Sequence, residues 1–175
     1  MNINETLKHY FGYDSLRPGQ QELIEGILQR KDALGIMPTG AGKSLCYQVP
    51  ALMLDGITIV VSPLISLMTD QVKALNQAGV HAAYINSSLT ENQIRTALFY
   101  AAQGRYKIIY VAPERLNTMR FLEFACQVDI SMVTVDEAHC ISQWGQDFRP
   151  SYVGIADFLA QLPKRPVVSA FTATA

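Results

Sequence analysis

The stretch Ala33-Leu34-Gly35-Ile36-Met37-Pro38-Thr39-Gly40-Ala41-Gly42-Lys43-Ser44 joins a short apolar run to a glycine-rich loop. Residues 45–49 follow directly and are compatible with a helix. A strand, a glycine loop and a helix in this order form the context that a phosphate-binding loop requires. The stretch therefore predicts an α/β domain with a phosphate site where the loop meets the helix.

The expected nucleotide-binding residues of this loop are Thr39, Gly40, Ala41, Gly42, Lys43 and Ser44. Gly40 and Gly42 permit positive φ and a close backbone approach, so successive N–H groups can point at phosphate oxygens. We expect Lys43 to reach the β- and γ-phosphates and Ser44 to bind Mg²⁺. The strict pattern has glycine where this chain has Met37. Taken alone, the segment is also compatible with a glycine-rich turn that carries a solvated lysine.

A second motif supplies two carboxylates. Ser131–Val135 is an apolar, β-type run that ends in Asp136 and Glu137. This places both side chains at the carboxyl end of a buried strand, where the ligand sites of α/β sheets lie. Asp136 fits the role of holding Mg²⁺ through its water shell, and Glu137 fits the base that orients or deprotonates the attacking water. Either residue alone is compatible with an acidic strand cap. Together with Lys43 they predict a site that hydrolyses a nucleoside triphosphate.

Composition indicates one domain with a substantial core, because the 175 residues are 49% hydrophobic and 17% charged. The formal net charge is −1, so any contact with a nucleic-acid backbone has to use local basic side chains and helix N-termini. Three cysteines without Cys-x-x-Cys spacing indicate reduced thiols, and neither disulfides nor a zinc site. No apolar stretch approaches the length of a membrane span, and residues 1–5 lack the basic and apolar regions expected of a signal peptide. We expect a cytoplasmic protein, associated with the nucleoid if it is bacterial.

Apolar β-type runs alternate with segments long enough for helices. The expected strands are Ala33–Met37, Thr58–Val61, Ala82–Ile85, Ile108–Val111, Ser131–Val135 and Val167–Phe171. The expected helices are Gln20–Arg30, Ser66–Gln77, Glu91–Gln103 and Tyr152–Gln161. This alternation predicts right-handed βαβ units and a parallel sheet with helices on both faces. Pro50 lies in the helix after the phosphate loop, and we expect that helix to kink or restart near Val49.

Several further segments resemble the motifs of superfamily-2 helicases, and the most similar family is the RecQ family of DNA helicases. The resemblance runs from Phe11 to Ala175. It implies a RecA-like phosphate-loop NTPase domain that uses ATP and Mg²⁺. The segment from Tyr13 to Gln20 is similar to the family's adenine-reading segment, which implies that Gln20 pairs with the adenine edge. Tyr13 then stacks on the base, with Arg17 alongside. Without the family, Pro18-Gly19 would simply start the helix at Gln20.

Two segments resemble the motifs that touch the single-strand backbone in these helicases. They are Val61–Met68 and Ala112–Leu116, and they imply DNA contacts for Ser62, Pro63 and Arg115. Each is also compatible with a proline at a strand-to-helix junction. The final Thr172-Ala173-Thr174 resembles the motif that links hydrolysis to strand movement, with the hydroxyls of Thr172 and Thr174 near the magnesium-binding carboxylates. We therefore predict that the strand ending in Thr172 lies between the phosphate-loop strand and the strand ending in Asp136.

The stretch from Ala138 to Pro150 resembles the aromatic-rich loop of the RecQ family, which senses single-stranded DNA and reports to the nucleotide site. The resemblance implies this role for His139, Trp144, Phe148 and Arg149. Aromatic rings offer flat faces on which bases stack, and arginine adds charge. A buried Trp144 that anchors the loop is the alternative. The family usually has histidine where this chain has Gln146.

The resemblance as a whole implies the first RecA-like domain of an ATP-dependent DNA helicase that moves 3′ to 5′, in a family associated with DNA repair and recombination. The partners expected are DNA and a second RecA-like domain across the ATP cleft. Because the chain ends just after a strand, we expect it to be part of a longer protein. The alternatives are a superfamily-2 RNA helicase and a non-catalytic nucleic-acid-binding module of the same fold.

Overall fold

The computed structural model describes residues 1–38, 42–142 and 149–173. Six strands are present in these residues: β1 (Ala33–Ile36), β2 (Ile57–Val61), β3 (Ala82–Ile85), β4 (Ile108–Val111), β5 (Ile130–Val135) and β6 (Val167–Thr172). The longer helices are α2 (Gln20–Leu28), α3 (Lys43–Met53), α4 (Ile65–Gln77), α5 (Glu91–Ala102), α6 (Met119–Gln127) and α7 (Gly154–Gln161). Shorter helical segments are α1 (Ile3–Thr6), η1 (Leu7–Phe11), η2 (Pro113–Arg115), η3 (Ala138–Ile141) and η4 (Pro150–Val153).

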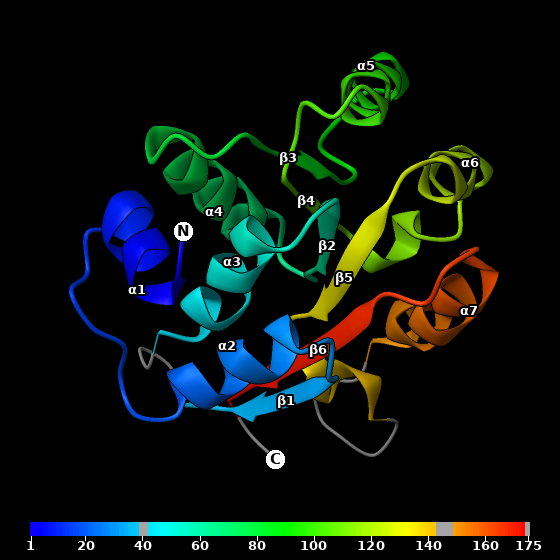
Figure 1. The fold of residues 1–175 in the computed structure, drawn as a ribbon. Helices are drawn as coiled ribbons and strands as arrows, with labels where there is room; N and C mark the ends of the chain where they lie inside the picture. The colour runs from blue at the N-terminus through cyan, green and yellow to red at the C-terminus, as the bar shows by residue number, and fades with distance from the viewer. Residues whose placement is uncertain (39–41, 143–148, 174–175) are drawn as a thin grey trace.

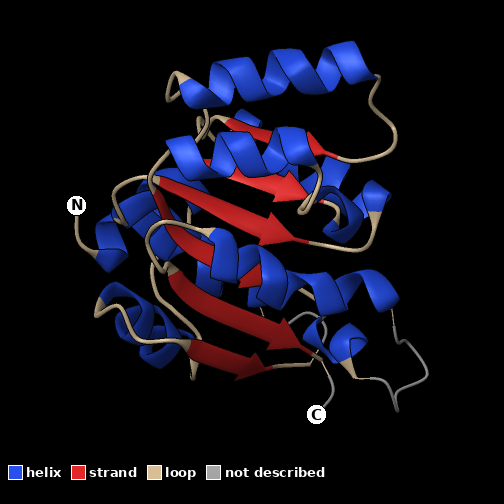
Figure 2. Cartoon of the chain, turned by 90° about the vertical axis from the view of Figure 1, so that its right-hand side faces the viewer, coloured by secondary structure: helices blue, strands red, loops and turns tan. Residues whose placement is uncertain are grey.

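All strand pairs in the sheet are parallel, and Figure 2 shows the strand arrows pointing the same way. The strand order is β1-β6-β5-β2-β4-β3. Strand β6 therefore separates the phosphate-loop strand β1 from β5, which leads to Asp136. Thr172 pairs in register with Ile36 of β1, and Ala170 pairs with Val135 of β5. This order confirms the predicted insertion of the strand that ends in Thr172.

Helices cover both faces of the sheet. α2, α3 and α4 lie on one side, and α5, α6 and α7 lie on the other (Figure 1). The first face buries side chains such as Tyr47 and Met68, and the second buries Phe121 and Phe158. Every residue of β2 and β5 is buried, as expected of central parallel strands covered on both faces. The α/β architecture predicted from the alternation of strands and helices is thus confirmed.

Some element boundaries differ from those predicted. Helix α3 runs through Pro50 to Met53, so the restart expected near Val49 is wrong. Proline removes one helical hydrogen bond, but the buried neighbours Cys46, Tyr47 and Ala51 hold this helix in the core. The last helix begins at Gly154, because Pro150–Val153 forms a separate turn, η4. None of the helices in the described part of the chain is long and apolar enough to cross a membrane.

Candidate nucleotide-binding site

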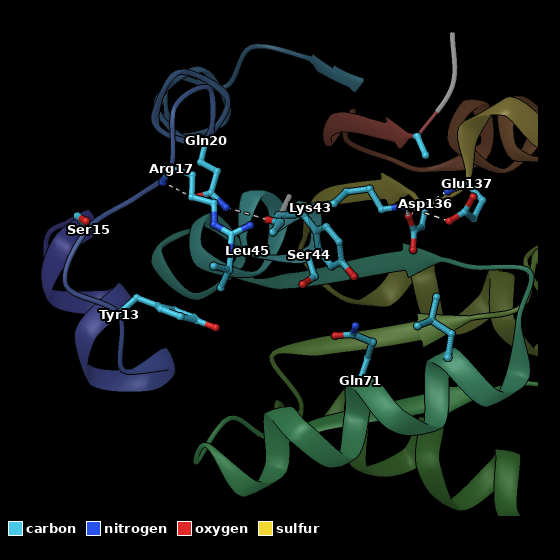
Figure 3. Close-up of a pocket in the computed structure, with 14 residues that line it drawn as sticks. Tyr13, Ser15, Arg17, Gln20, Lys43, Ser44, Leu45, Gln71, Asp136 and Glu137 are labelled. Carbon is cyan, nitrogen blue, oxygen red and sulfur yellow. Dashed lines mark hydrogen bonds and ion pairs between the residues drawn. The ribbon is translucent and has the colours of Figure 1, made fainter. Parts of the chain in front are cut away.

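A cavity of about 500 Å³ lies where β1, β6 and β5 end and α3 begins. Its lining combines residues from the N-terminal segment, α3, α4 and the carboxyl ends of β5 and β6: Tyr13, Ser15, Arg17, Gln20, Gly42, Lys43, Ser44, Leu45, Tyr47, Leu67, Gln71, Asp136, Glu137 and Ala173. Figure 3 shows Tyr13 and Gln20 at one end of this cavity and Asp136 and Glu137 at the other. Among the described residues, the fold therefore gathers the predicted base-reading residues and the predicted residues Gly42, Lys43, Ser44, Asp136 and Glu137 in one pocket.

Lys43 is the first residue of α3 and follows Gly42, whose φ of 75° is in the left-handed region that glycine adopts without strain. The Nζ atom of Lys43 lies 3.0 Å from Oδ1 of Asp136 and 3.0 Å from Oε1 of Glu137. Lys43 thus meets Asp136 and Glu137, which lie more than ninety positions later in the sequence, in a single ion-paired cluster.

Burial and charge act in opposite directions on this cluster. Burial raises the pKa of the Asp136 carboxyl, which is only 3% exposed, and the Lys43 ammonium offsets part of that rise. For Lys43, burial favours the neutral amine, but the nearby Asp136 and Glu137 carboxylates outweigh it and raise the net pKa of the ammonium. Lys43 therefore stays charged across the physiological range, and the cluster is built to surround a cation.

The backbone around Asp136 is held on both sides. Its N–H donates to the carbonyl of Val61 at 2.9 Å, and its own carbonyl accepts the hydroxyl proton of Tyr152 at 2.7 Å. The next residue, Glu137, has φ 53° and ψ 47°, a left-handed conformation that is uncommon outside glycine. Its N–H donates to Oδ1 of Asp136 at 3.0 Å. Glu137 thus combines an uncommon backbone conformation with the ion pair to Lys43. Tyr152 was not predicted from the sequence.

Gln20 joins the N-terminal segment to the phosphate loop. Its Nε2 donates to the carbonyl of Gly42 at 3.0 Å, and its Oε1 accepts the N–H of Arg17 at 2.6 Å. The side chain is 1% exposed. A methyl group added at Gly42 would collide with Gln20 Nε2. Gln20 therefore contacts the residue that directly precedes α3, whereas the predicted contact of Gln20 with adenine stays a prediction. Tyr13 is exposed at the edge of the pocket.

The end of β6 contacts the carboxylate cluster through His139. The Nδ1 atom of His139 lies 2.9 Å from the hydroxyl of Thr172 and 3.5 Å from Oε2 of Glu137. The predicted proximity of the Thr172 hydroxyl to the carboxylate motif is thus present, with His139 as the bridge. Thr174 lies outside the described residues.

The remaining predicted DNA-side residues that the structure describes are not among the residues that line the pocket. Ser62 is fully buried, so its side chain is not available to a ligand in this arrangement, and Pro63 beside it is half-buried. Arg115 in η2 is 3.5 Å from Glu91, and Arg149 is exposed. Five further predicted residues, namely Thr39, Gly40, Ala41, Trp144 and Phe148, fall outside the described residues.

Sequence reasoning missed several residues of the pocket wall. Tyr47 follows Lys43 by four positions on α3, so its place on the same helix face has a local signal. Leu67 and Gln71 come from α4, and only the packing of α4 against α3 brings them to the pocket. No spacing in the sequence indicates that contact.

Comparisons with known proteins agree with this geometry. Residues 17–175 match the DEAD/DEAH box helicase family. The chain belongs to that family. The chain is 52% identical over 170 residues to the ATP-dependent DNA helicase RecQ of Bacillus subtilis, a match that covers 97% of the chain and 29% of the relative. It is 48% identical to the RecQ helicase of Haemophilus influenzae, over 97% of the chain and 27% of that relative. The family resemblance found in the motifs is thus confirmed, and the chain spans less than a third of the length of these relatives.

Solved structures show the same fold at low sequence identity. A hypothetical ATP-dependent RNA helicase from Sulfolobus tokodaii aligns with this chain at a TM-score of 0.75 and 22% identity, covering 99% of this chain and 51% of that one. The DUF1998 helicase MrfA bound to DNA and AMPPNP aligns at 0.71 and 16% identity, covering 98% of this chain and 26% of that one. At these identities the likeness shows the fold alone.

Proposed function

We propose that this chain is the first RecA-like domain of a RecQ-type, ATP-dependent DNA helicase, and that it binds ATP with Mg²⁺ and contacts single-stranded DNA. The observation that carries the proposal is the cluster of Lys43, Asp136 and Glu137 at one end of the pocket. The sequence identity of 52% and 48% to two RecQ DNA helicases supports the choice of DNA as substrate. The proposed direction of movement, 3′ to 5′, rests on the family resemblance. The proposed location in the cytoplasm rests on the sequence.

The pocket residues divide the work of hydrolysis. On ATP binding, Lys43 would move away from the carboxylates of Asp136 and Glu137 and bind the β- and γ-phosphates. The phosphate oxygens carry negative charge, as the two carboxylates do. Glu137, freed from Lys43, would accept a proton from the attacking water. At the other end, Tyr13 would stack on the base, and Gln20 would keep the loop in register through Gly42.

The residues at this site fit Mg²⁺. The carboxylates of Asp136 and Glu137 already flank one cation, the Lys43 ammonium, and Ser44 follows it in the pocket wall. Ser44 and, through water, Asp136 would hold the metal. Bound Mg²⁺ would neutralise charge on the phosphate oxygens.

Two rival functions are less well supported. An RNA helicase would share the fold, but the similarity to the RNA helicase structure is 22% and shows the fold alone. A non-catalytic module would not need Lys43, Asp136 and Glu137 to be intact and clustered. In the proposed helicase, a second RecA-like domain would form the opposite wall of the pocket and close on ATP.

Two variants in the full-length helicase test the catalytic assignment. Lys43→Ala should remove phosphate binding, and Glu137→Gln should leave ATP bound but barely hydrolysed, because an amide cannot accept the water proton. We expect kcat to fall by about 100-fold or more in each, a barrier increase of roughly 2.7 kcal/mol. The measurements are steady-state ATP hydrolysis and binding of a fluorescent ATP analogue.

Lys164→Ala is the matched control, because it also removes a lysine that is ion-paired, here to Asp129 on the surface. It should hydrolyse ATP like the wild type. Turnover of both site variants within about threefold of wild type, a barrier change under about 1 kcal/mol, would show that the assignment is wrong.

A further inference from the structure

A chain of buried polar side chains lies between the nucleotide pocket and α4. The hydroxyls of Tyr47 and Tyr110 are 2.8 Å apart, and Nε2 of Gln48 lies 3.0 Å from the Tyr110 hydroxyl. The same Gln48 nitrogen donates to Oε1 of Gln71 at 2.9 Å. Tyr47 and Tyr110 are each 1% exposed and Gln48 is 4% exposed. We call these four residues the polar relay.

The polar relay joins three elements that otherwise pack through apolar contacts. Tyr47 and Gln48 lie on α3, one turn after the lysine that binds phosphate in the proposed function. Tyr110 lies in β4, and Gln71 lies in α4. Burial raises the pKa of both tyrosine hydroxyls, so they remain neutral hydrogen-bonding groups. The relay is therefore a set of directional contacts within the apolar core.

Both ends of the relay reach the nucleotide pocket. Tyr47 and Gln71 line the nucleotide pocket, and Figure 3 shows the Gln71 side chain pointing from α4 into that pocket, on the side of Ser44. The segment Val61–Met68, which resembles a DNA-contacting motif, runs into α4, which begins at Ile65. Strand β4 leads directly into the second such segment, which contains Arg115. The relay thus connects the pocket to the elements that carry both segments.

Apolar side chains would fill this space at lower cost, because a buried polar group is unfavourable unless all its partners are in place. Hydrogen bonds also fix direction, which apolar contacts do not. A displacement of α3 relative to α4 or β4 would therefore stretch or break hydrogen bonds of the relay.

We propose, on the basis of the proposed function, that Gln48 and Tyr110 are positioning residues that couple ATP in the pocket to DNA bound at the ends of β2 and β4. Gln71 lines the pocket and lies on α4, so it is the member that joins the relay to this helix. The coupling acts through the hydrogen bonds of the relay and requires no change in the residues that touch phosphate.

The test is the ratio of DNA-stimulated to basal ATP hydrolysis in the full-length helicase. Tyr110→Phe removes one hydroxyl and no volume, and Tyr110 does not line the pocket. We expect the ratio to fall about tenfold, within the usual range of coupling between two sites, while basal kcat stays within about twofold of wild type. Ser169→Ala is the matched control, because it also deletes a buried hydroxyl, one paired to Thr134 at 2.9 Å between β5 and β6. Its ratio should equal that of wild type.

A second variant separates coupling from stability. In Tyr110→Phe the Tyr47 hydroxyl loses the Tyr110 hydroxyl as its partner, which should lower the melting temperature. Combining Tyr47→Phe with Tyr110→Phe removes both hydroxyls of this hydrogen bond, so the melting temperature should rise back toward that of wild type. The stimulation ratio should stay low, because the link from α3 to β4 is still missing. Recovery of both quantities, or a wild-type ratio in Tyr110→Phe, would overturn the coupling role. A wild-type enzyme without DNA-stimulated hydrolysis would instead overturn the proposed function.

Discussion

At the scale of single residues, Asp136 shows a conflict between stability and chemistry. Its carboxyl is almost fully buried, which disfavours the charged form, yet the proposed metal site needs that charge. Lys43 at 3.0 Å lessens the cost without removing it, since the pKa of Asp136 remains raised. Burial thus acts against the charged form of Asp136 more strongly than Lys43 favours it.

This conflict predicts that Asp136→Asn abolishes ATP hydrolysis but does not destabilise the domain at pH 7. An acid with a raised pKa binds its proton more tightly in the folded state, so stability falls as pH rises from the ordinary value of 3.8 through the raised value. The amide removes this penalty, and Lys43 keeps Glu137 as a partner. A gain of about 1 kcal/mol would raise the melting temperature by about 2–4 °C.

Melting curves of both proteins between pH 3 and pH 8 provide the measurement. The difference between variant and wild type should grow with pH and then level off. Asp70→Asn, at an exposed position on α4, serves as the control and should leave the curve unchanged. A variant that melts well below wild type at pH 7 would mean that the ion pair with Lys43 outweighs the burial of Asp136.

At the scale of elements, the junction between the phosphate loop and α3 depends on Gly42. Its φ of 75° is in the left-handed region, and an added Cβ would strike Gln20. Gly12 has the same φ of 75° but has no atom within 4 Å of an added Cβ among the described residues. The two glycines therefore have the same left-handed φ, but only at Gly42 would an added Cβ meet a neighbouring side chain.

Gly42→Ala and Gly12→Ala should share the cost of left-handed backbone, roughly 1–2 kcal/mol. Only Gly42→Ala should also displace Gln20 and weaken binding of an ATP analogue, by about tenfold, or roughly 1.4 kcal/mol. Chemical denaturation gives the free energy of unfolding of each variant, and fluorescence titration gives its affinity for the ATP analogue. Equal ATP affinity in the two variants would refute the role of Gln20 in fixing the loop.

The sequence predicted elements and local motifs better than contacts between distant elements. All six strands follow from apolar runs, and the meeting of Lys43 with Asp136 follows from the rule that parallel strands end at one edge. The uninterrupted course of α3 through Pro50 did not follow, because packing overrode the local preference of proline. The pairing of Gln48 with Gln71 had no local signal, since it depends on how α3 and α4 pack.

At the scale of the whole molecule, the strand order places three chemically distinct segments side by side. The phosphate loop, the Thr172 strand end and the Asp136-Glu137 pair follow the neighbouring strands β1, β6 and β5. The segments that resemble DNA-contacting motifs follow β2 and β4, the next two strands along the sheet. One edge of a single sheet thus carries a nucleotide region and a proposed DNA region, and the polar relay lies where they meet.

A crystal structure of this chain with Mg²⁺ and a non-hydrolysable ATP analogue tests the central claim most directly. The account predicts that the base lies near Tyr13, that Nζ of Lys43 leaves Asp136 and Glu137 for the β- and γ-phosphates, and that Mg²⁺ lies between Ser44 and Asp136. An analogue bound outside this pocket, or phosphates held without Lys43 while its two ion pairs persist, would contradict the account.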